Sequence, residues 1–272
     1  MIAKIMLNAL VVSVMNLYGI GDLVCASNFV FSSAKVVFDQ SAQTEQDNPV
    51  RGEIRQTYKL ASRANVEVSG IEGSVSVETT NGDTAELHWV REARTQNDFD
   101  CETIVIEHSP KSLVVRHETK KDNRCKVIQA SEQMKLLVPR SANLKFSNIE
   151  GGFSSGATDG FLHLENIEGA VRIEQAQSAE ISSVESDLSL NVAQVSSRGI
   201  NIHNIEGAVD LGIAKNLNAD LIGSDRLENV QINIPNIQTS AFDRKNYRLR
   251  IGTGGAGISI SNIEGGVRVR GI

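Results

Sequence analysis

Six glutamates recur at the same place in a short repeated phrase, and clustered carboxylates are what acid–base catalysis and Ca²⁺ binding require. The phrase is Asn-Ile-Glu-Gly or a close variant, and its glutamates are Glu72, Glu150, Glu168, Glu185, Glu206 and Glu264. If the repeats stack, these carboxylates form one outward row with a spacing of about 4.8 Å. Like charges at that distance repel by about 1 kcal/mol even in water, so salt, basic neighbours or cations must offset the repulsion.

Three interpretations of this row remain open. The favoured one is a solvated acidic row. The second is a row that binds cations, with Glu150, Glu168, Glu185 and Glu206 as weak candidate metal ligands. The third is a catalytic carboxylate pair, which is disfavoured because nothing singles out two members of the row.

Other chemistry-bearing patterns do not point to an active site. The five histidines (His88, His108, His117, His163 and His203) share no metal-ligand spacing. The sequence contains no Gly-x-Ser-x-Gly nucleophile motif, and the glycine-rich segment 251–257 precedes an expected strand instead of a helix. We therefore predict no catalytic residue and no cofactor.

The flanks of the phrase repeat as well, with apolar residues at positions −4, −2, +1, +5 and +7 from the asparagine. Around Asn166 these residues are Leu162, Leu164, Ile167, Val171 and Ile173. A degenerate copy around Ser183 divides the 38 residues between Asn166 and Asn204 into steps of 17 and 21 residues. Each step has room for one pair of short strands. Such self-similarity predicts stacked repeats. The expected fold is all-β: a right-handed parallel β-solenoid, with turns of 17 to 21 residues and longer antiparallel strands near 84–138.

Two positions of the phrase are expected to be structural. By strand parity, position zero points inward, which predicts a buried side-chain ladder of Asn148, Asn166, Ser183, Asn204 and Asn262. The glycines at +3 should provide either a positive φ or close backbone approach at each bend. They are Gly73, Gly151, Gly169, Gly207 and Gly265.

Composition agrees with a narrow aliphatic core. The 272 residues are 40% hydrophobic but only 4% aromatic, and 22 glycines stand against four prolines. The net charge is −6 with the signs interspersed, and no basic stripe is present, so nucleic acid is not an expected partner.

The first 26 residues read as a cleaved secretory signal: Lys4 precedes an apolar stretch, and Val24-Cys25-Ala26 is an acceptable cleavage site. Acylation of Cys25 as a lipoprotein is the alternative. Cleavage leaves Cys101 and Cys125, an even count that favours a disulfide in an exported chain. Residues 27–52 are expected to hold a strand and a polar linker, and 53–272 the repeat domain.

This layout resembles the exported bacterial "putative adhesin" domain family. The resemblance rests on the alternating segment 66–77 with its glycine bend, the Asn81-Gly82-Asp83 turn with the strand after it, and the Leu136–Pro139 strand that opens the short turns. It covers roughly 53–272 and implies a short β-solenoid, without implying any catalytic residue.

From these observations we expect a non-catalytic periplasmic, outer-membrane-associated or secreted protein that binds an envelope or surface ligand, a glycan or a protein. A carbohydrate-active β-helix enzyme and a Ca²⁺-dependent binding module are the alternatives. The chain stops directly after a repeat copy, at 262–272. We therefore expect a strand edge there that is either covered by an earlier segment, with 27–60 as the leading candidate, or used for homo-association through the ends.

Overall fold

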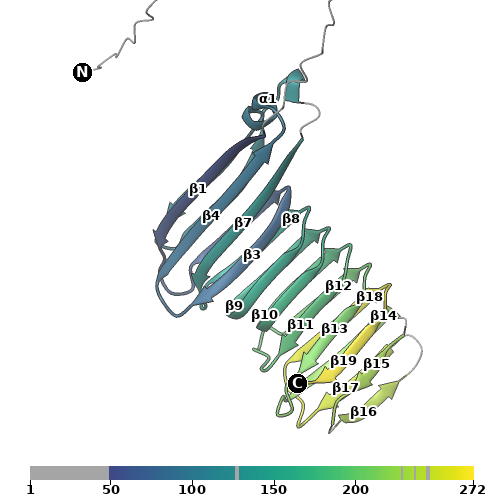
Figure 1. Ribbon diagram of the computed structural model, residues 1–272. Helices are drawn as coiled ribbons and strands as arrows, with labels where there is room; N and C mark the ends of the chain where they lie inside the picture. The colour runs from purple at the N-terminus through teal and green to yellow at the C-terminus, as the bar shows by residue number, and fades with distance from the viewer. Residues whose placement is uncertain (1–48, 126–128, 228, 236, 243–245) are drawn as a thin grey trace, which may run out of the picture. The chain divides into compact units, whose positions relative to one another are not determined.

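The computed structural model describes residues 49–125, 129–227, 229–235, 237–242 and 246–272, and these form an all-β structure with one short helix (Figure 1). The predicted signal at 1–26, Cys25 and most of the predicted linker lie outside the described residues. Within the described part, no helix is long and apolar enough to cross a membrane. The helical elements are α1 (Gln96–Asp100) and the 3-10 turn η1 (Asn123–Cys125). The strands are β1 (Val50–Lys59), β2 (Asn65–Ile71), β3 (Gly73–Thr80), β4 (Thr84–Ala93), β5 (Glu102–Ser109), β6 (Ser112–Thr119), β7 (Ala130–Pro139), β8 (Asn143–Ile149), β9 (Phe153–Ile167), β10 (Val171–Val184), β11 (Leu188–Val192), β12 (Ile200–Ile205), β13 (Val209–Ile213), β14 (Ala219–Leu227), β15 (Gln231–Asn233), β16 (Ile237–Phe242), β17 (Asn246–Ile251), β18 (Gly257–Ile263) and β19 (Val267–Gly271).

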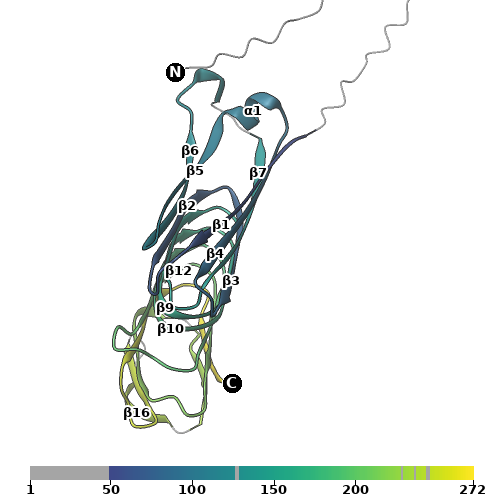
Figure 2. The same cartoon turned by 90° about the vertical axis from the view of Figure 1, so that its left-hand side faces the viewer.

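The repeats build two parallel ladders, and the chain passes from one to the other in every turn (Figures 1 and 2). The first ladder runs β2, β8, β9, β10, β12, β18 and β14. The second runs β3, β9, β10, β11, β13, β19 and β15. The long strands β9 and β10 belong to both ladders, each contributing its first residues to the second ladder and its last residues to the first.

The predicted all-β class and the parallel stacking of the repeats are therefore confirmed. The predicted right hand of the coil stays a prediction. The apolar positions of the repeat line the space between the ladders, as the pattern predicts: Leu162, Leu164 and Ile167 are fully buried. Most core residues are aliphatic, which allows the two ladders to pack closely with few aromatic rings between them.

The prediction that position zero points inward is wrong. Asn148, Asn166, Ser183, Asn204 and Asn262 all have φ between 52° and 57°, the left-handed region. A left-handed residue breaks the strand alternation, so positions −2 and +1 both point into the core while position zero faces outward. Asn148, Asn166 and Asn204 are accordingly exposed, and Ser183 and Asn262 are half-buried. Asparagine suits this position because it is the non-glycine residue that adopts this conformation most readily.

The bend glycines are required because neighbouring backbone segments approach closely, and not because the backbone needs a positive φ. None of Gly73, Gly151, Gly169, Gly207 and Gly265 has a positive φ. A Cβ atom on Gly169 would lie 2.5 Å from the carbonyl carbon of Gly151, and one on Gly265 would lie 2.5 Å from that of Gly207. The corners at Gly151, Gly169, Gly207 and Gly265 are therefore seated on the backbone of the neighbouring corner, with no room for a side chain between them.

The segment 84–139 forms the antiparallel part of the fold, as the sequence predicts. β4 pairs with β1 and β7, and β5 pairs with β6, while β6 and β7 attach to the ladders through β2 and β3. The Cys101–Cys125 disulfide is present and joins the C-terminal end of α1 to η1.

The last repeat does not end the stack. β18 lies between β12 and β14, and β19 lies between β13 and β15, although 219–233 precede both strands in the chain. The hairpin β16–β17 then pairs with β14 in antiparallel fashion. The strands at 257–271 are therefore covered by an earlier segment, as predicted, and the segment that covers them is 219–233. The described part of 27–60, β1, pairs with β4 in the antiparallel part and does not cover these strands.

Replacing Gly169 with alanine should destabilise the protein, because the new Cβ would meet the backbone of Gly151 and Gly152 at 2.5 Å. Overpacking of this kind costs about 1–3 kcal/mol. Thermal unfolding measures the effect. Gly82→Ala is the matched control, since its nearest atom would be 3.6 Å away. Equal melting temperatures for the two variants would contradict the seating of one corner on the next.

Ile260→Ala tests the inserted position of the last repeat. Ile260 is fully buried and pairs with Ile202 on one side and Gly223 on the other. Truncating such a core residue should lower the free energy of unfolding by about 2–5 kcal/mol. Ile272→Ala is the control, because Ile272 is 46% exposed. A small loss for both variants would mean that the last repeat is a frayed end.

Candidate functional site

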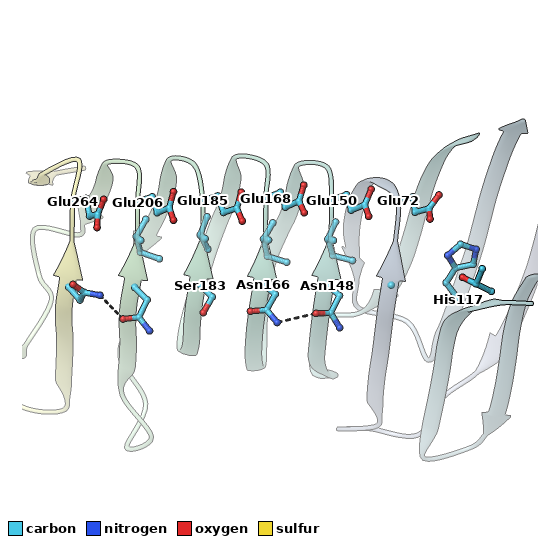
Figure 3. Close-up of a pocket in the computed structure, with 18 residues that line it drawn as sticks. Glu72, His117, Asn148, Glu150, Asn166, Glu168, Ser183, Glu185, Glu206 and Glu264 are labelled. Carbon is cyan, nitrogen blue, oxygen red and sulfur yellow. Dashed lines mark hydrogen bonds between the residues drawn. The ribbon is translucent and has the colours of Figure 1, made fainter. Parts of the chain in front are cut away.

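The repeated corners form one groove, which we call the corner groove (Figure 3). It has a volume of about 590 Å³ and is lined by the six glutamates and the five position-zero residues of the repeat copies. In Figure 3 the glutamates run in one line from Glu72 to Glu264, parallel to the row that contains Asn148, Asn166 and Ser183. Both rows face outward on either side of the buried residue at +1.

Backbone hydrogen bonds set the spacing of the glutamate row. The backbone amides of five of the six glutamates donate to the carbonyl oxygen of the +1 residue in the neighbouring turn. These N–O distances are 3.0 Å for Glu150, Glu168, Glu185 and Glu264 and 2.9 Å for Glu206. The carboxylates therefore follow one another at the spacing of paired strands, about 4.8 Å. The row is rigid at its backbone and open to solvent at its carboxylates.

Side-chain amides connect the asparagine row. Asn166 donates from Nδ2 to Oδ1 of Asn148 at 3.0 Å, and Asn262 donates to Asn204 at 2.8 Å. Ser183 lies between the two pairs. Because each amide uses only one donor (Asn166, Asn262) or one acceptor (Asn148, Asn204) in these bonds, it keeps further hydrogen-bonding capacity for a ligand in the groove.

The glutamate row carries uncompensated repulsion near its first members. The pKa of the Glu150 carboxyl is raised by partial burial and by the charges of Glu72 and Glu168. Attraction of a positively charged or hydrogen-bond-donating ligand would relieve this repulsion. A cation would relieve it too, but the sequence-predicted metal ligands Glu150, Glu168, Glu185 and Glu206 are held in a line and do not converge, so that assignment stays a prediction.

At one end the groove meets a buried polar cluster, formed by Glu72, Arg91, Glu102, His117 and Glu132. Arg91, Glu102 and Glu132 have relative exposures of 0%, 6% and 2%. An Arg91 nitrogen contacts the Glu102 carboxylate, and another lies 3.8 Å from Oε1 of Glu132. The His117 Nε2 atom is 3.6 Å from Glu102 Oε2 and 3.6 Å from Glu132 Oε1. Glu72 directly follows β2, and the other four residues lie on β4, β5, β6 and β7. The antiparallel segment therefore completes the cluster.

The buried donors and acceptors of the cluster are poorly matched. Burial raises the pKa of Glu132 to about 7, and the charge of Glu72 adds to this rise. The charge of Arg91, the backbone amide of Glu72 and the Trp89 indole oppose it. Burial lowers the pKa of His117. Neither carboxylate oxygen of Glu132 meets a donor in good hydrogen-bond geometry, and neither does Nε of Arg91 meet an acceptor. Buried polar groups in this condition are uncommon.

The sequence pattern does not bring this cluster together, because its members come from separate strands. A signal was present, however. Arg91 continues the inward alternation of Leu87 and Trp89 on β4, and Glu132 continues that of Leu136 and Met134 on β7. Charged residues at inward strand positions must find partners, so both could have been flagged as members of a buried polar site.

No family model and no curated protein matches the chain. Solved structures with similarity include a "putative cell adhesion protein" from Clostridium sporogenes, with a TM-score of 0.44, 11% identity and coverage of 82% of this chain and 99% of that one. A "putative adhesin" from Bacteroides fragilis has a TM-score of 0.31 and 12% identity over 81% of this chain and 97% of that one. A "putative lipid binding protein" from Parabacteroides distasonis has a TM-score of 0.27 and 11% identity over 80% and 96%.

Substitutions at Asn166 separate the two roles of position zero. Asn166→Ala should lose the side-chain hydrogen bond to Asn148. It also places alanine, which has a poor preference for the left-handed region, at φ 56°. We expect a loss of about 1–2 kcal/mol in the free energy of unfolding. Asn166→Gly loses the bond but tolerates the backbone conformation, so it should cost less. Chemical denaturation measures both, and a glycine variant less stable than the alanine variant would contradict the assignment.

Glu150→Gln tests the repulsion within the row. Because folding raises the pKa of Glu150, the folded state binds its proton more readily, and stability from this group falls as pH rises through the carboxyl range. The variant should therefore gain stability over the wild type at neutral pH but not at acidic pH, and salt should shrink the gain. Glu78→Gln, at an exposed glutamate outside the row, is the control. A pH-independent difference for Glu150→Gln would contradict this account.

Proposed function

We propose that this is a non-catalytic, exported binding protein that holds an extended polar ligand along the corner groove. The observation that carries the proposal is the parallel pair of outward rows, carboxylates and amides, held in register by backbone hydrogen bonds from turn to turn. A surface that repeats at a fixed spacing suits a ligand that repeats as well.

The chemistry of the lining favours a hydrophilic polymer with ammonium or hydroxyl groups, such as an amino-bearing envelope glycan. Carboxylates accept charge-assisted hydrogen bonds from ammonium groups, and side-chain amides both donate to and accept from hydroxyl groups. The lining residues include no Phe, Tyr or Trp, so little binding energy is available from aromatic contacts. Affinity should therefore come from many weak polar contacts and fall with salt.

Equivalence of the row members supports binding in preference to catalysis. Acid–base catalysis needs two carboxyl groups whose surroundings separate their pKa values. Here five of the six glutamates, Glu150, Glu168, Glu185, Glu206 and Glu264, occupy the same corner position with the same backbone hydrogen bond. A basic protein segment is the second kind of ligand that could follow the row, and a Ca²⁺-bridged ligand the third; the binding experiment separates them.

The disulfide supports export of the protein. Cys101 and Cys125 are bonded, and disulfides persist mainly in oxidising compartments. We therefore place the protein in the periplasm, at the outer membrane or outside the cell, with residues 1–26 as its signal.

Co-sedimentation with insoluble envelope polymers tests the proposal. The groove variant replaces Glu168, Glu185 and Glu206 with Gln, and the control variant replaces Glu78, Glu86 and Glu174, which are exposed and outside the groove. Both changes alter the net charge equally. We expect the wild type and the control to bind an amino-bearing glycan, with binding weakened by salt and at least about tenfold in the groove variant.

Equal binding by the two variants, or no binding of any polymer, would contradict the proposal. Repeating the assay with a chelator and with added Ca²⁺ identifies a cation-bridged ligand. Binding of basic peptides in place of glycans would assign the groove to a protein partner.

A further inference from the structure

We propose that Glu72, Glu102 and His117, at the end of the corner groove, form a binding site for a first-row divalent metal ion such as Zn²⁺. This site goes beyond the proposed function, because it needs neither the rest of the glutamate row nor a polymer ligand. Among the described residues it is the one group of three or more His, Cys, Asp or Glu side chains whose ligand atoms all lie within 4.8 Å of one another.

The distances fit contraction around a small cation. A tetrahedral zinc site with bonds of about 2.0–2.1 Å brings its ligand atoms to about 3.3 Å from one another. His117 Nε2 and Glu102 Oε2 are 3.6 Å apart, so only a few tenths of an ångström of movement are needed between them. Glu72 is half-buried at the corner and supplies the third atom from the solvent side. Oε1 of Glu132 is 3.6 Å from the same Nε2 but lies outside the converging group of three, so it faces the histidine without completing the set.

The histidine is oriented as metal-binding histidines are. Its ring forms a hydrogen bond with the backbone of Gly70, while Nε2 faces the carboxylates. A ring nitrogen that donates to a backbone carbonyl leaves the other nitrogen as the ligand atom. A mixed set of imidazole and carboxylate suits Zn²⁺ and its first-row neighbours better than Ca²⁺, which takes oxygen ligands alone.

Charge balance is the second, independent observation. Three carboxylates, Glu72, Glu102 and Glu132, face a single guanidinium, that of Arg91. The Glu132 side chain is fully buried, is directed toward His117, and has no hydrogen-bonding donor in good geometry on either oxygen. One divalent cation supplies the charge that Arg91 alone does not.

Arg91 is the group that a metal ion must displace in part. Its NH1 lies 3.4 Å from His117 Nε2, and its NH2 lies 3.4 Å from the Asp98 carbonyl oxygen. Its NH2 also contacts Oε2 of Glu102, a proposed ligand atom. The guanidinium must therefore yield both His117 Nε2 and Glu102 Oε2 to the ion, and it can keep the Asp98 carbonyl and Glu132 as partners. Arg91 thus holds the carboxylates together in the metal-free protein.

Equilibrium dialysis of chelator-treated protein against Zn²⁺, with metal analysis, tests the site. We expect one Zn²⁺ per chain and a higher melting temperature with Zn²⁺ than with Ca²⁺. His117→Gln and Glu72→Gln should each weaken binding at least about tenfold. Glu72→Gln leaves the buried Arg91–Glu102 pair in place, so it tests the site even if His117→Gln does not fold.

His163→Gln is the matched control. His163 also lies 3.6 Å from each of two glutamates, Glu165 and Glu180, but on an exposed strand face where the two carboxylates do not converge. The His163→Gln variant should bind Zn²⁺ as the wild type does. Co²⁺ substitution should give the visible absorption of a low-symmetry site in the wild type and the control alone. Absent Zn²⁺ binding, or binding retained in folded Glu72→Gln or lost in His163→Gln, would overturn the proposal. The assay contains no polymer, so its failure leaves the proposed function untouched.

Discussion

The structure depends on how closely one corner can approach the next. At position +3 the backbones of neighbouring turns come so near that a Cβ atom would lie about 2.5 Å from a carbonyl carbon. Three residues earlier, the chain must turn through a left-handed conformation so that positions −2 and +1 both reach the core. Glycine meets the first demand and asparagine the second. The recurrence of Asn-Ile-Glu-Gly follows from these two demands, with Ile filling the core and Glu facing solvent.

The same corner explains why the groove exists. With position zero and position +2 both directed outward around one buried residue, every turn adds one amide and one carboxylate to the same edge. Backbone bonds fix the spacing, so the charge density of the row cannot relax by moving the turns apart. The repulsion that raises the pKa of Glu150 is thus a consequence of the fold. The buried cluster at the groove's end has the opposite character, since burial and poorly matched hydrogen-bonding groups dominate there.

The sequence predicted the local pattern well and the long-range order poorly. Apolar periodicity around Asn166 identified the strands and core, and the even cysteine count identified the disulfide. Simple strand parity gave the wrong face for Asn166, because one left-handed residue resets the alternation. The order of the repeats along the chain predicted the wrong position for 262–272 in the stack. The pairing of one turn with another is decided by the fit between their corners and not by their order in the sequence. The cluster around His117 was missed for the same reason: its residues meet only through tertiary pairing.

The last repeat is inserted between earlier strands because its corner fits closely on the corner of an earlier repeat. The corner at Asn262 and Gly265 seats on that at Asn204 and Gly207, whereas segment 219–233 lacks the Glu-Gly bend and pairs on the outer side. Disulfide trapping with cysteine pairs tests this order directly. Ser261 is in register with His203 on one side and Ser224 on the other. Partners in adjacent strands lie about 4.8 Å apart, within reach of a disulfide, whereas strands two steps apart are about 9.6 Å away and out of reach. Mass analysis of non-reduced peptides should show cross-links for the 203/261 and 224/261 pairs and none for 203/224; efficient cross-linking of 203/224 would contradict the account.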